Sequence, residues 1–164
     1  NTGSGKGKTT AAMGVLFRAW GRDMNVIMLQ FIKHTTANFG EQRAAQKIGI
    51  TVRAMGDGFT WRSRDLDQSA DLARALWDDA QEIITTGGYD IVILDEFTYP
   101  MHYGWIPVED VIETLKKRPE MQHVIITGRH APEDLVEYAD LVTEMSVVKH
   151  PYSSGIKAQP GIEF

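Results

Sequence analysis

Residues 2–9 read TGSGKGKT, a glycine-rich stretch followed by residues with helical spacing. The stretch has the GKT ending and the spacing of a Walker A phosphate loop, except that Thr2 stands where the first glycine usually lies. Glycines let backbone N–H groups converge on phosphate oxygens, and a helix starting near Lys8 adds its positive dipole end. Lys8 brings a full charge, and the Thr9 hydroxyl is expected to ligate Mg²⁺. The residues expected to bind the nucleotide here are Thr2, Gly3, Ser4, Gly5, Lys6, Gly7, Lys8, Thr9 and Thr10.

An apolar run farther along the chain ends in an acidic pair. Residues 89–94 read YDIVIL and are followed by Asp95 and Glu96. A Walker B site places an aspartate at the end of such a strand, so that its carboxylate faces Mg²⁺ across the sheet from the phosphate loop. Asp95 fits this description. The neighbouring Glu96 could activate a water molecule, as in hydrolysing ATPases, or bind the metal itself.

Strand and helix patterns alternate along the whole chain. Apolar, β-branched runs predict strands at residues 25–31, 50–54, 89–94, 122–127 and 141–148. Spacings of three and four predict helices at residues 8–22, 41–48, 65–85, 108–117 and 132–138. Residues 55–64 and 149–164 lack a clear period and are predicted to be irregular.

This alternation predicts an α/β fold of the P-loop NTPase (RecA-like) type. We expect three layers, α/β/α, with a mostly parallel sheet and ligands beyond the carboxyl ends of the strands. Residues 1–164 are expected to form a single nucleotide-binding domain. Because a phosphate loop normally follows a β-strand, we also expect the natural protein to have a first strand and an N-terminal segment before Asn1.

The composition narrows the class of protein. A formal charge of -5 argues against a broad surface for duplex nucleic acid. The lack of cysteine excludes thiolate zinc sites and cysteine nucleophiles, and it favours a reducing cytoplasm. The apolar runs are far shorter than the roughly 20 residues that span a bilayer, so no membrane segment is expected. The 5 histidines lack close metal-binding spacings, so no protein-bound metal is assigned to them.

Several further segments narrow the function. They read GFTW at residues 58–61, LDEFTY at 94–99, VIITGR at 124–129, and VKH followed by GIKAQ in the tail at 148–159. Together with the phosphate loop they resemble the P-loop family of corrinoid adenosyltransferases. The resemblance keeps the same order over essentially the whole chain, whereas any one segment alone would be a weak signal.

The resemblance implies transfer of the 5′-deoxyadenosyl group of ATP to the Co(I) centre of a corrinoid. Triphosphate is then the leaving group, and the reaction belongs to adenosylcobalamin biosynthesis or salvage. Lys8, Lys6, Thr9 and Mg²⁺ would stabilise the charge that develops on the departing triphosphate. In the family, the positions that match Thr9 and Glu96 serve the metal, and Asp95 is expected beside them.

Phe59 and Trp61 match aromatic residues that the family places against the lower face of the corrinoid. In an extended loop both side chains point to the same side, and neither offers a strong metal donor. They would displace the lower axial ligand, which eases reduction of Co(II). Without the resemblance, two loop aromatics are more often core plugs or partner contacts.

The remaining candidates carry less specific signals. Arg129 follows a strand end and is expected to contact ATP through its fork of donors, and Lys33 follows another strand end. Lys149, His150 and Lys157 lie in the tail and fit solvated polar residues equally well. The resemblance further implies an electron donor such as a reduced flavoprotein and a homodimer. The composition favours a cytoplasmic location with no nucleic-acid or membrane partner.

Three other functions compete with this interpretation. The first is a RecA-like ATPase acting on single-stranded nucleic acid, in which Glu96 activates water while Phe59 and Trp61 stack on bases. The second is a small-molecule kinase, but thymidine kinases of similar core carry a cysteine zinc site that this chain lacks. The third is a nucleotide switch that uses residues 55–64 as its contact surface. None of them explains why separate segments resemble one family.

Overall fold

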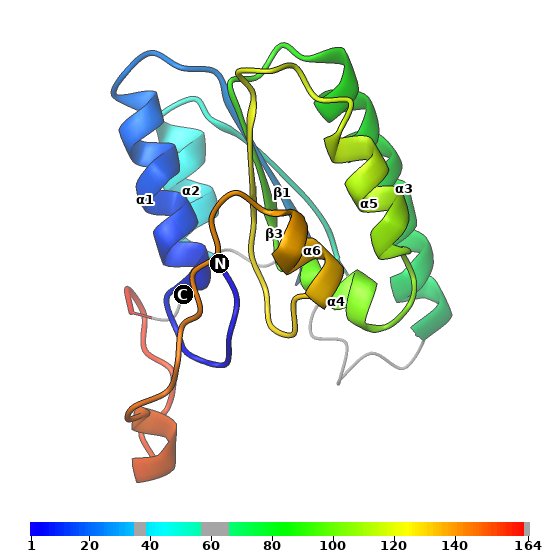
Figure 1. The fold of residues 1–164 in the computed structure, drawn as a ribbon. Helices are drawn as coiled ribbons and strands as arrows, with labels where there is room; N and C mark the ends of the chain where they lie inside the picture. Colours follow the sequence, from blue (N-terminus) through cyan, green and yellow to red (C-terminus); the bar gives the residue numbers. More distant parts are fainter. Residues whose placement is uncertain (35–38, 57–65, 163–164) are drawn as a thin grey trace.

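The protein contains a parallel β-sheet with helices on both faces (Figure 1). The computed structural model describes residues 1–34, 39–56 and 66–162. In this part of the chain the sheet has the order β2-β1-β3-β4, and every neighbouring pair is parallel. The strands are β1 (Val26–His34), β2 (Thr51–Gly56), β3 (Ile91–Asp95) and β4 (His123–Ile126). The predicted α/β class with a mostly parallel sheet is confirmed.

The helices complete the three predicted layers. On one side of the sheet lie α1 (Lys8–Trp20) and α2 (Gly40–Lys47), and on the other lie α3 (Leu66–Thr86), α5 (Val108–Leu115) and α6 (Glu133–Tyr138) (Figure 1). A short helix, α4 (Thr98–His102), follows β3, and a 3-10 turn, η2 (Pro151–Ser154), lies in the tail. No described helix is both long and apolar enough to cross a membrane.

The central strands are buried on both faces, as their continuous apolar runs predict. Leu29 and Leu94 pack with α3 and α5 in one hydrophobic cluster, whereas Met28 and Ile93 pack with α1 in the other. Successive strand residues therefore serve opposite layers, because side chains alternate across a strand. Phe97, just after β3, fills the first cluster and stacks on Trp77 of α3 with ring centroids 4.9 Å apart. This packing holds the carboxyl end of β3 in place.

The strand predicted over residues 141–148 is wrong. Among the described residues, Glu144 alone of this segment forms a β-bridge, an isolated parallel bridge to Thr2, which lies outside the sheet strands. Thr2 donates to the Thr143 carbonyl at 2.9 Å, and its own carbonyl accepts from Met145 at 2.9 Å. After Thr2 the chain turns into the phosphate loop, so a longer ladder has no partner among the described residues. Beyond the bridge the segment is open to solvent, and Val148 is 98% exposed.

Other differences from the sequence-based elements are smaller. Residues 55–56 continue β2 instead of starting a loop, and β1 extends to His34. Helix α4 was not predicted, because its five residues TYPMH include a proline and are too short to show a period. The tail is irregular as predicted, except for the turn η2.

Candidate functional site

The phosphate loop lies at the carboxyl edge of the sheet. The Asn1 amino group donates to the Ile126 carbonyl at 2.9 Å, and Gly128 N–H donates to the Asn1 carbonyl at 3.2 Å. The loop therefore starts beside the end of β4. Gly7 ends the loop with a φ of 105°, a conformation that favours glycine, and its carbonyl accepts from Ala11 at 2.8 Å to open α1. The N-terminus of α1 thus follows the loop directly, as predicted for an anion-binding site.

The segment 143–145, which precedes the tail, contacts the phosphate loop, and the sequence did not indicate this contact. Gly5 N–H donates to the Met145 carbonyl at 2.5 Å. A Cβ atom at Gly3 or Gly5 would lie 2.6 Å from the same carbonyl oxygen, closer than real Cβ atoms come. These two glycines therefore allow the backbone of residues 143–145 to approach the loop. The Gly5 N–H is therefore hydrogen-bonded within the protein.

Lys8 shares its surroundings with Glu96 and Arg129. Its Nζ donates to the Gly5 carbonyl at 2.5 Å. Burial lowers the pKa of Lys8, repulsion from Arg129 lowers it further, and attraction to Glu96 raises it. Arg129 is exposed, and its carbonyl accepts a hydrogen bond from Thr98 Oγ1 at the start of α4. The structure thus brings together a lysine, an arginine and a glutamate that the sequence placed far apart.

Asp95 is the buried centre of the site. It has no exposed surface, and its Oδ1 accepts from the Thr9 hydroxyl and from the Thr127 hydroxyl, both at 2.7 Å. Its Oδ2 accepts from Gln30 Nε2 at 3.1 Å. A buried charge needs such partners, because water cannot solvate it. Thr9 and Asp95, which the sequence predicts on either side of Mg²⁺, are joined here by a direct hydrogen bond.

Two further side chains extend this arrangement. Gln42 of α2 donates to Gln30 Oε1 at 2.8 Å, and the Glu96 N–H donates to Thr127 Oγ1 at 2.9 Å. Gln30, Gln42 and Thr127 are not among the predicted site residues. A signal was available for two of them: Gln30 is the polar residue within the apolar run VIMLQFI, and Thr127 follows the apolar end of β4.

Glu96 differs from its neighbour Asp95 in exposure and backbone. Glu96 is partly exposed, whereas Asp95 is fully buried. The φ of Glu96 is 58°, in the left-handed region that few residues other than glycine adopt. Such backbone conformations occur often at active sites, where surrounding contacts hold them. The Glu96 side chain is therefore accessible to a ligand. The buried Asp95 side chain can influence a ligand only through the residues that contact it.

The donor set fits Mg²⁺. Hydroxyl and carboxylate oxygens of Thr9, Asp95 and Glu96 are hard ligands of the kind that this ion prefers. Among the described residues no group of three or more His, Asp or Glu side chains is arranged to hold a metal. Mg²⁺ is commonly bound by one or two protein groups plus substrate phosphates and water, so a full protein cage is not required.

The remaining predicted residues either lie outside the described part of the chain or are more exposed than Asp95. Phe59 and Trp61 lie outside the described residues, and the side chain of Lys33 is likewise not described. Ser4, Lys6 and Thr10 are exposed on or just after the loop. In the tail, Lys149 and Lys157 are exposed, while His150 Nδ1 accepts from Tyr152 N–H at 3.1 Å and begins η2.

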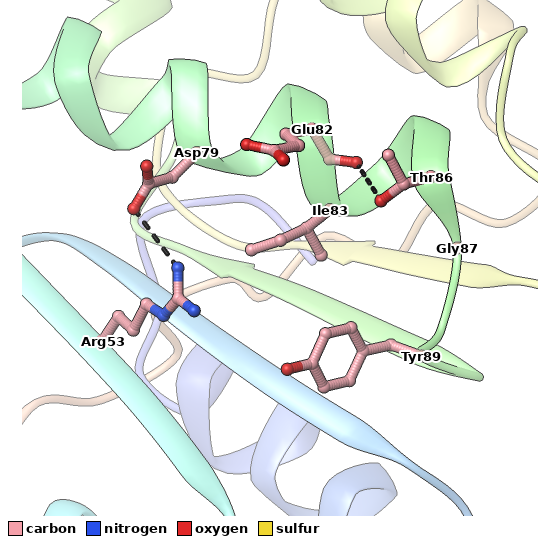
Figure 2. A pocket seen from close by; sticks show the side chains of 7 residues that line it. All are labelled: Arg53, Asp79, Glu82, Ile83, Thr86, Gly87 and Tyr89. Atoms are coloured by element: carbon pink, nitrogen blue, oxygen red, sulfur yellow. Dashed lines mark hydrogen bonds and ion pairs between the residues drawn. The ribbon is translucent and has the colours of Figure 1, made fainter.

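A separate hollow of about 200 Å³ lies between β2 and the second half of α3 (Figure 2). Arg53 and Asp79 form an ion pair at 3.3 Å there, and Tyr89 and Glu82 line it as well. Its described lining residues include none from the phosphate loop and none that contact Asp95. The candidate site therefore remains the carboxyl edge of the sheet.

Comparison with known proteins identifies related chains. The family model of ATP:corrinoid adenosyltransferase BtuR/CobO/CobP matches residues 1–164. A corrinoid adenosyltransferase of Sinorhizobium sp is 44% identical over 168 residues, which cover 100% of this chain and 78% of the relative. The corrinoid adenosyltransferase of Escherichia coli K12 is 42% identical, with 99% of this chain and 83% of the relative covered. The corrinoid adenosyltransferase CobA of Salmonella typhimurium has the same identity and coverage.

Proposed function

The chain belongs to the ATP:corrinoid adenosyltransferase family, and from that premise we propose how its residues serve the reaction. The activity is ATP-dependent adenosylation of a corrinoid in cobalamin biosynthesis. The family match over residues 1–164 carries the activity, and the hydrogen bond between Thr9 and Asp95, at the edge where Lys8 and Glu96 also lie, supports the nucleotide site. We propose that residues 1–164 act as one nucleotide-binding domain.

The reaction exchanges one bond at the ribose 5′ carbon for another. The bond between C5′ and the α-phosphate oxygen breaks, and its electron pair leaves with triphosphate. The new bond joins C5′ to cobalt, and both of its electrons come from the Co(I) centre of the corrinoid substrate. Because the substrate is itself a strong nucleophile, the protein supplies alignment and charge stabilisation, and it needs no general base. Glu96 is therefore not assigned to water activation.

Lys8 is the residue we assign to the leaving group. Its ammonium is partly buried and donates to the neutral Gly5 carbonyl. Anionic phosphate oxygens are stronger acceptors than a carbonyl, so triphosphate would replace Gly5 at Nζ. Lys8 would then stabilise the negative charge that grows on triphosphate as the C5′–O bond breaks. Arg129 and Lys6 add positive charge at the same edge.

The Mg²⁺ assignment follows from the direction of one hydrogen bond. Bound Mg²⁺ would neutralise part of the triphosphate charge. The Thr9 hydroxyl donates its hydrogen to Asp95, which leaves its oxygen lone pairs for a cation. Glu96, with its partial exposure, would contribute a carboxylate oxygen. Asp95 would act mainly through Thr9, because it is fully buried.

The corrinoid side of the proposal depends on the family resemblance. Phe59 and Trp61 are assigned to the lower face of the corrinoid, where apolar bulk without a donor atom would keep the axial ligand away and ease reduction. A reduced flavoprotein would supply the electron that converts Co(II) to Co(I). A homodimer and a cytoplasmic location are proposed on the same basis.

An anaerobic assay tests the proposal. Chemically reduced cob(I)alamin and Mg-ATP are mixed with the protein, the loss of Co(I) absorbance is followed, and the phosphate product is identified. We expect adenosylcobalamin and intact triphosphate in equal amounts. Lys8→Met should lower kcat/KM at least about 100-fold, since it removes a charge that stabilises the leaving group. Lys47→Met, an exposed lysine at the end of α2, should keep the normal rate.

One result would overturn the proposal. If cobalt stays unalkylated while ADP and phosphate accumulate, the protein hydrolyses ATP instead. Stimulation of that hydrolysis by single-stranded DNA or RNA would then favour the RecA-like ATPase.

A further inference from the structure

A chain of hydrogen bonds runs from α2 to the phosphate loop through the buried carboxylate. Gln42 donates to Gln30, Gln30 donates to Asp95, and Asp95 also accepts from Thr9. We propose that Gln30 and Thr127, supported by Gln42, are positioning residues that fix the Asp95 carboxylate and thereby orient the Thr9 hydroxyl toward Mg²⁺. The proposal rests on the proposed function, in which Thr9 serves the metal.

The chain can run in one direction only. Both oxygens of the Asp95 side chain accept hydrogen bonds, and Gln30 presents its NH₂ group to Oδ2. Its oxygen then faces α2, where Gln42 presents its own NH₂ group at 2.8 Å. The Asp95 carboxylate, as the last acceptor in this series of hydrogen bonds, thus determines which way the amides of Gln30 and Gln42 are oriented. A carboxylate at position 30 would face Asp95 with a like charge, which glutamine avoids.

Burial argues that Gln30 has a role beyond packing. Its side chain is 0% exposed within an otherwise apolar strand. An apolar residue could fill this space with no polar group to satisfy, whereas a buried amide is costly unless it is hydrogen-bonded. Gln30 meets that requirement at both ends, with Asp95 and with Gln42. The strand therefore accommodates a polar group that links Gln42 of α2 to Asp95.

Thr127 holds Asp95 from the side of β4. Its hydroxyl donates to Oδ1 at 2.7 Å, the same oxygen that accepts from Thr9, while its oxygen accepts from the Glu96 N–H at 2.9 Å. One hydroxyl thus contacts both acidic residues. It also helps to hold Glu96 in its left-handed backbone conformation.

These contacts restrict the rotation of the carboxylate. Gln30 holds Oδ2 and Thr127 holds Oδ1, so Oδ1 remains facing Thr9. As long as the Thr9 hydroxyl hydrogen has this fixed acceptor, the lone pairs of the Thr9 oxygen keep one direction. Partners of this kind, one step removed from a metal, commonly change metal affinity by about 10–100-fold when they are removed.

The test measures cation binding separately from catalysis. Mn²⁺ serves as a paramagnetic probe for Mg²⁺, and its affinity for the protein–ATP complex is measured by electron paramagnetic resonance without corrinoid. The variants are Gln30→Leu, Gln42→Leu, Thr127→Val, Thr127→Ser and Thr9→Ala. Two matched controls lie elsewhere: Gln46→Leu on the exposed part of α2, and Thr114→Val at a buried threonine that accepts from Gln81.

We expect Gln30→Leu and Thr127→Val to weaken Mn²⁺ binding about tenfold, with a smaller loss in Gln42→Leu. ATP affinity measured in EDTA should stay unchanged, and Thr127→Ser should restore normal Mn²⁺ binding because it keeps the hydroxyl. The controls should bind Mn²⁺ like the parent protein. If Gln30→Leu does not fold, the positioning role is tested by comparing Mn²⁺ binding of Thr127→Val with that of Thr127→Ser.

Two outcomes contradict the proposal in different ways. If Thr9→Ala weakens Mn²⁺ binding while Thr127→Val and Gln30→Leu resemble the controls, the positioning role is wrong and the proposed function stands. If Thr9→Ala itself leaves Mn²⁺ binding unchanged, the metal assignment of the proposed function fails, and the positioning role fails with it.

Discussion

Asp95 and Asp79 are carboxylates of the same fold that differ in burial. Asp95, at the end of β3, is fully buried and accepts hydrogen bonds from the uncharged side chains of Thr9, Thr127 and Gln30. Asp79, on α3, faces the cation Arg53 at 3.3 Å in the hollow of Figure 2, and both side chains are 46% exposed.

The difference shows how surroundings determine what an aspartate can do. Water solvates Asp79 whether or not Arg53 is near, so this ion pair contributes only about 0–1 kcal/mol and leaves both side chains free to move. Asp95 has no water to replace a lost partner. Each of its hydrogen bonds therefore fixes a direction as well as satisfying a charge. A site that must orient a ligand needs a carboxylate held as Asp95 is held.

The largest expected effect comes from removing the buried carboxylate. Asp95→Ala leaves the donors of Thr9, Thr127 and Gln30 without their acceptor, so we expect the free energy of unfolding to fall by about 3 kcal/mol. Adenosylation should fall at least about 100-fold, because Thr9 loses its orientation. Urea denaturation and the cobalt assay measure the two effects. An unfolding free energy equal to that of the parent protein would contradict the contrast with Asp79.

A smaller effect is expected where Met145 packs on the phosphate loop. Gly5→Ala places a Cβ atom 2.6 Å from the Met145 carbonyl oxygen, so the backbone at Met145 must move. The free energy of unfolding should fall by about 1–3 kcal/mol. Gly14→Ala is the matched control, since nothing lies within 4 Å of that position in α1. Alanine favours the helix there, so the control should gain about 0.5–1 kcal/mol. Thermal unfolding compares them, and equal changes would argue against the loop contact.

The smallest effect is expected at the exposed ion pair. Arg53→Ala should lower the unfolding free energy by less than about 1 kcal/mol and leave adenosylation unchanged. The difference from the parent protein should shrink in 1 M salt, because salt screens exposed charges. Denaturation at low and high salt tests this. A loss of activity in Arg53→Ala would mean that the hollow of Figure 2 communicates with the site.

Local patterns predicted most of the fold. The phosphate loop and α1 follow from residues adjacent in the chain, and YDIVIL with its acidic end indicated β3 and Asp95. The strand predicted over residues 141–148 failed although its own composition was suitable. A strand needs a neighbour, and of the described residues only Thr2 forms a bridge there. Whether a partner lies alongside is not a property of the segment itself.

By itself, the sequence determined the α/β class, the phosphate loop and the acidic strand end, because these depend on residue types at short spacings. It also carried the family resemblance, since motifs in a fixed order can be read without coordinates. Only the tertiary structure decided that Gln30, Gln42 and Thr127 surround Asp95, and that Met145 contacts Gly5. Thr9 and Asp95 themselves are 86 positions apart in the chain. Hydrogen bonds over such separations depend on how parallel strands align, and packing sets that alignment.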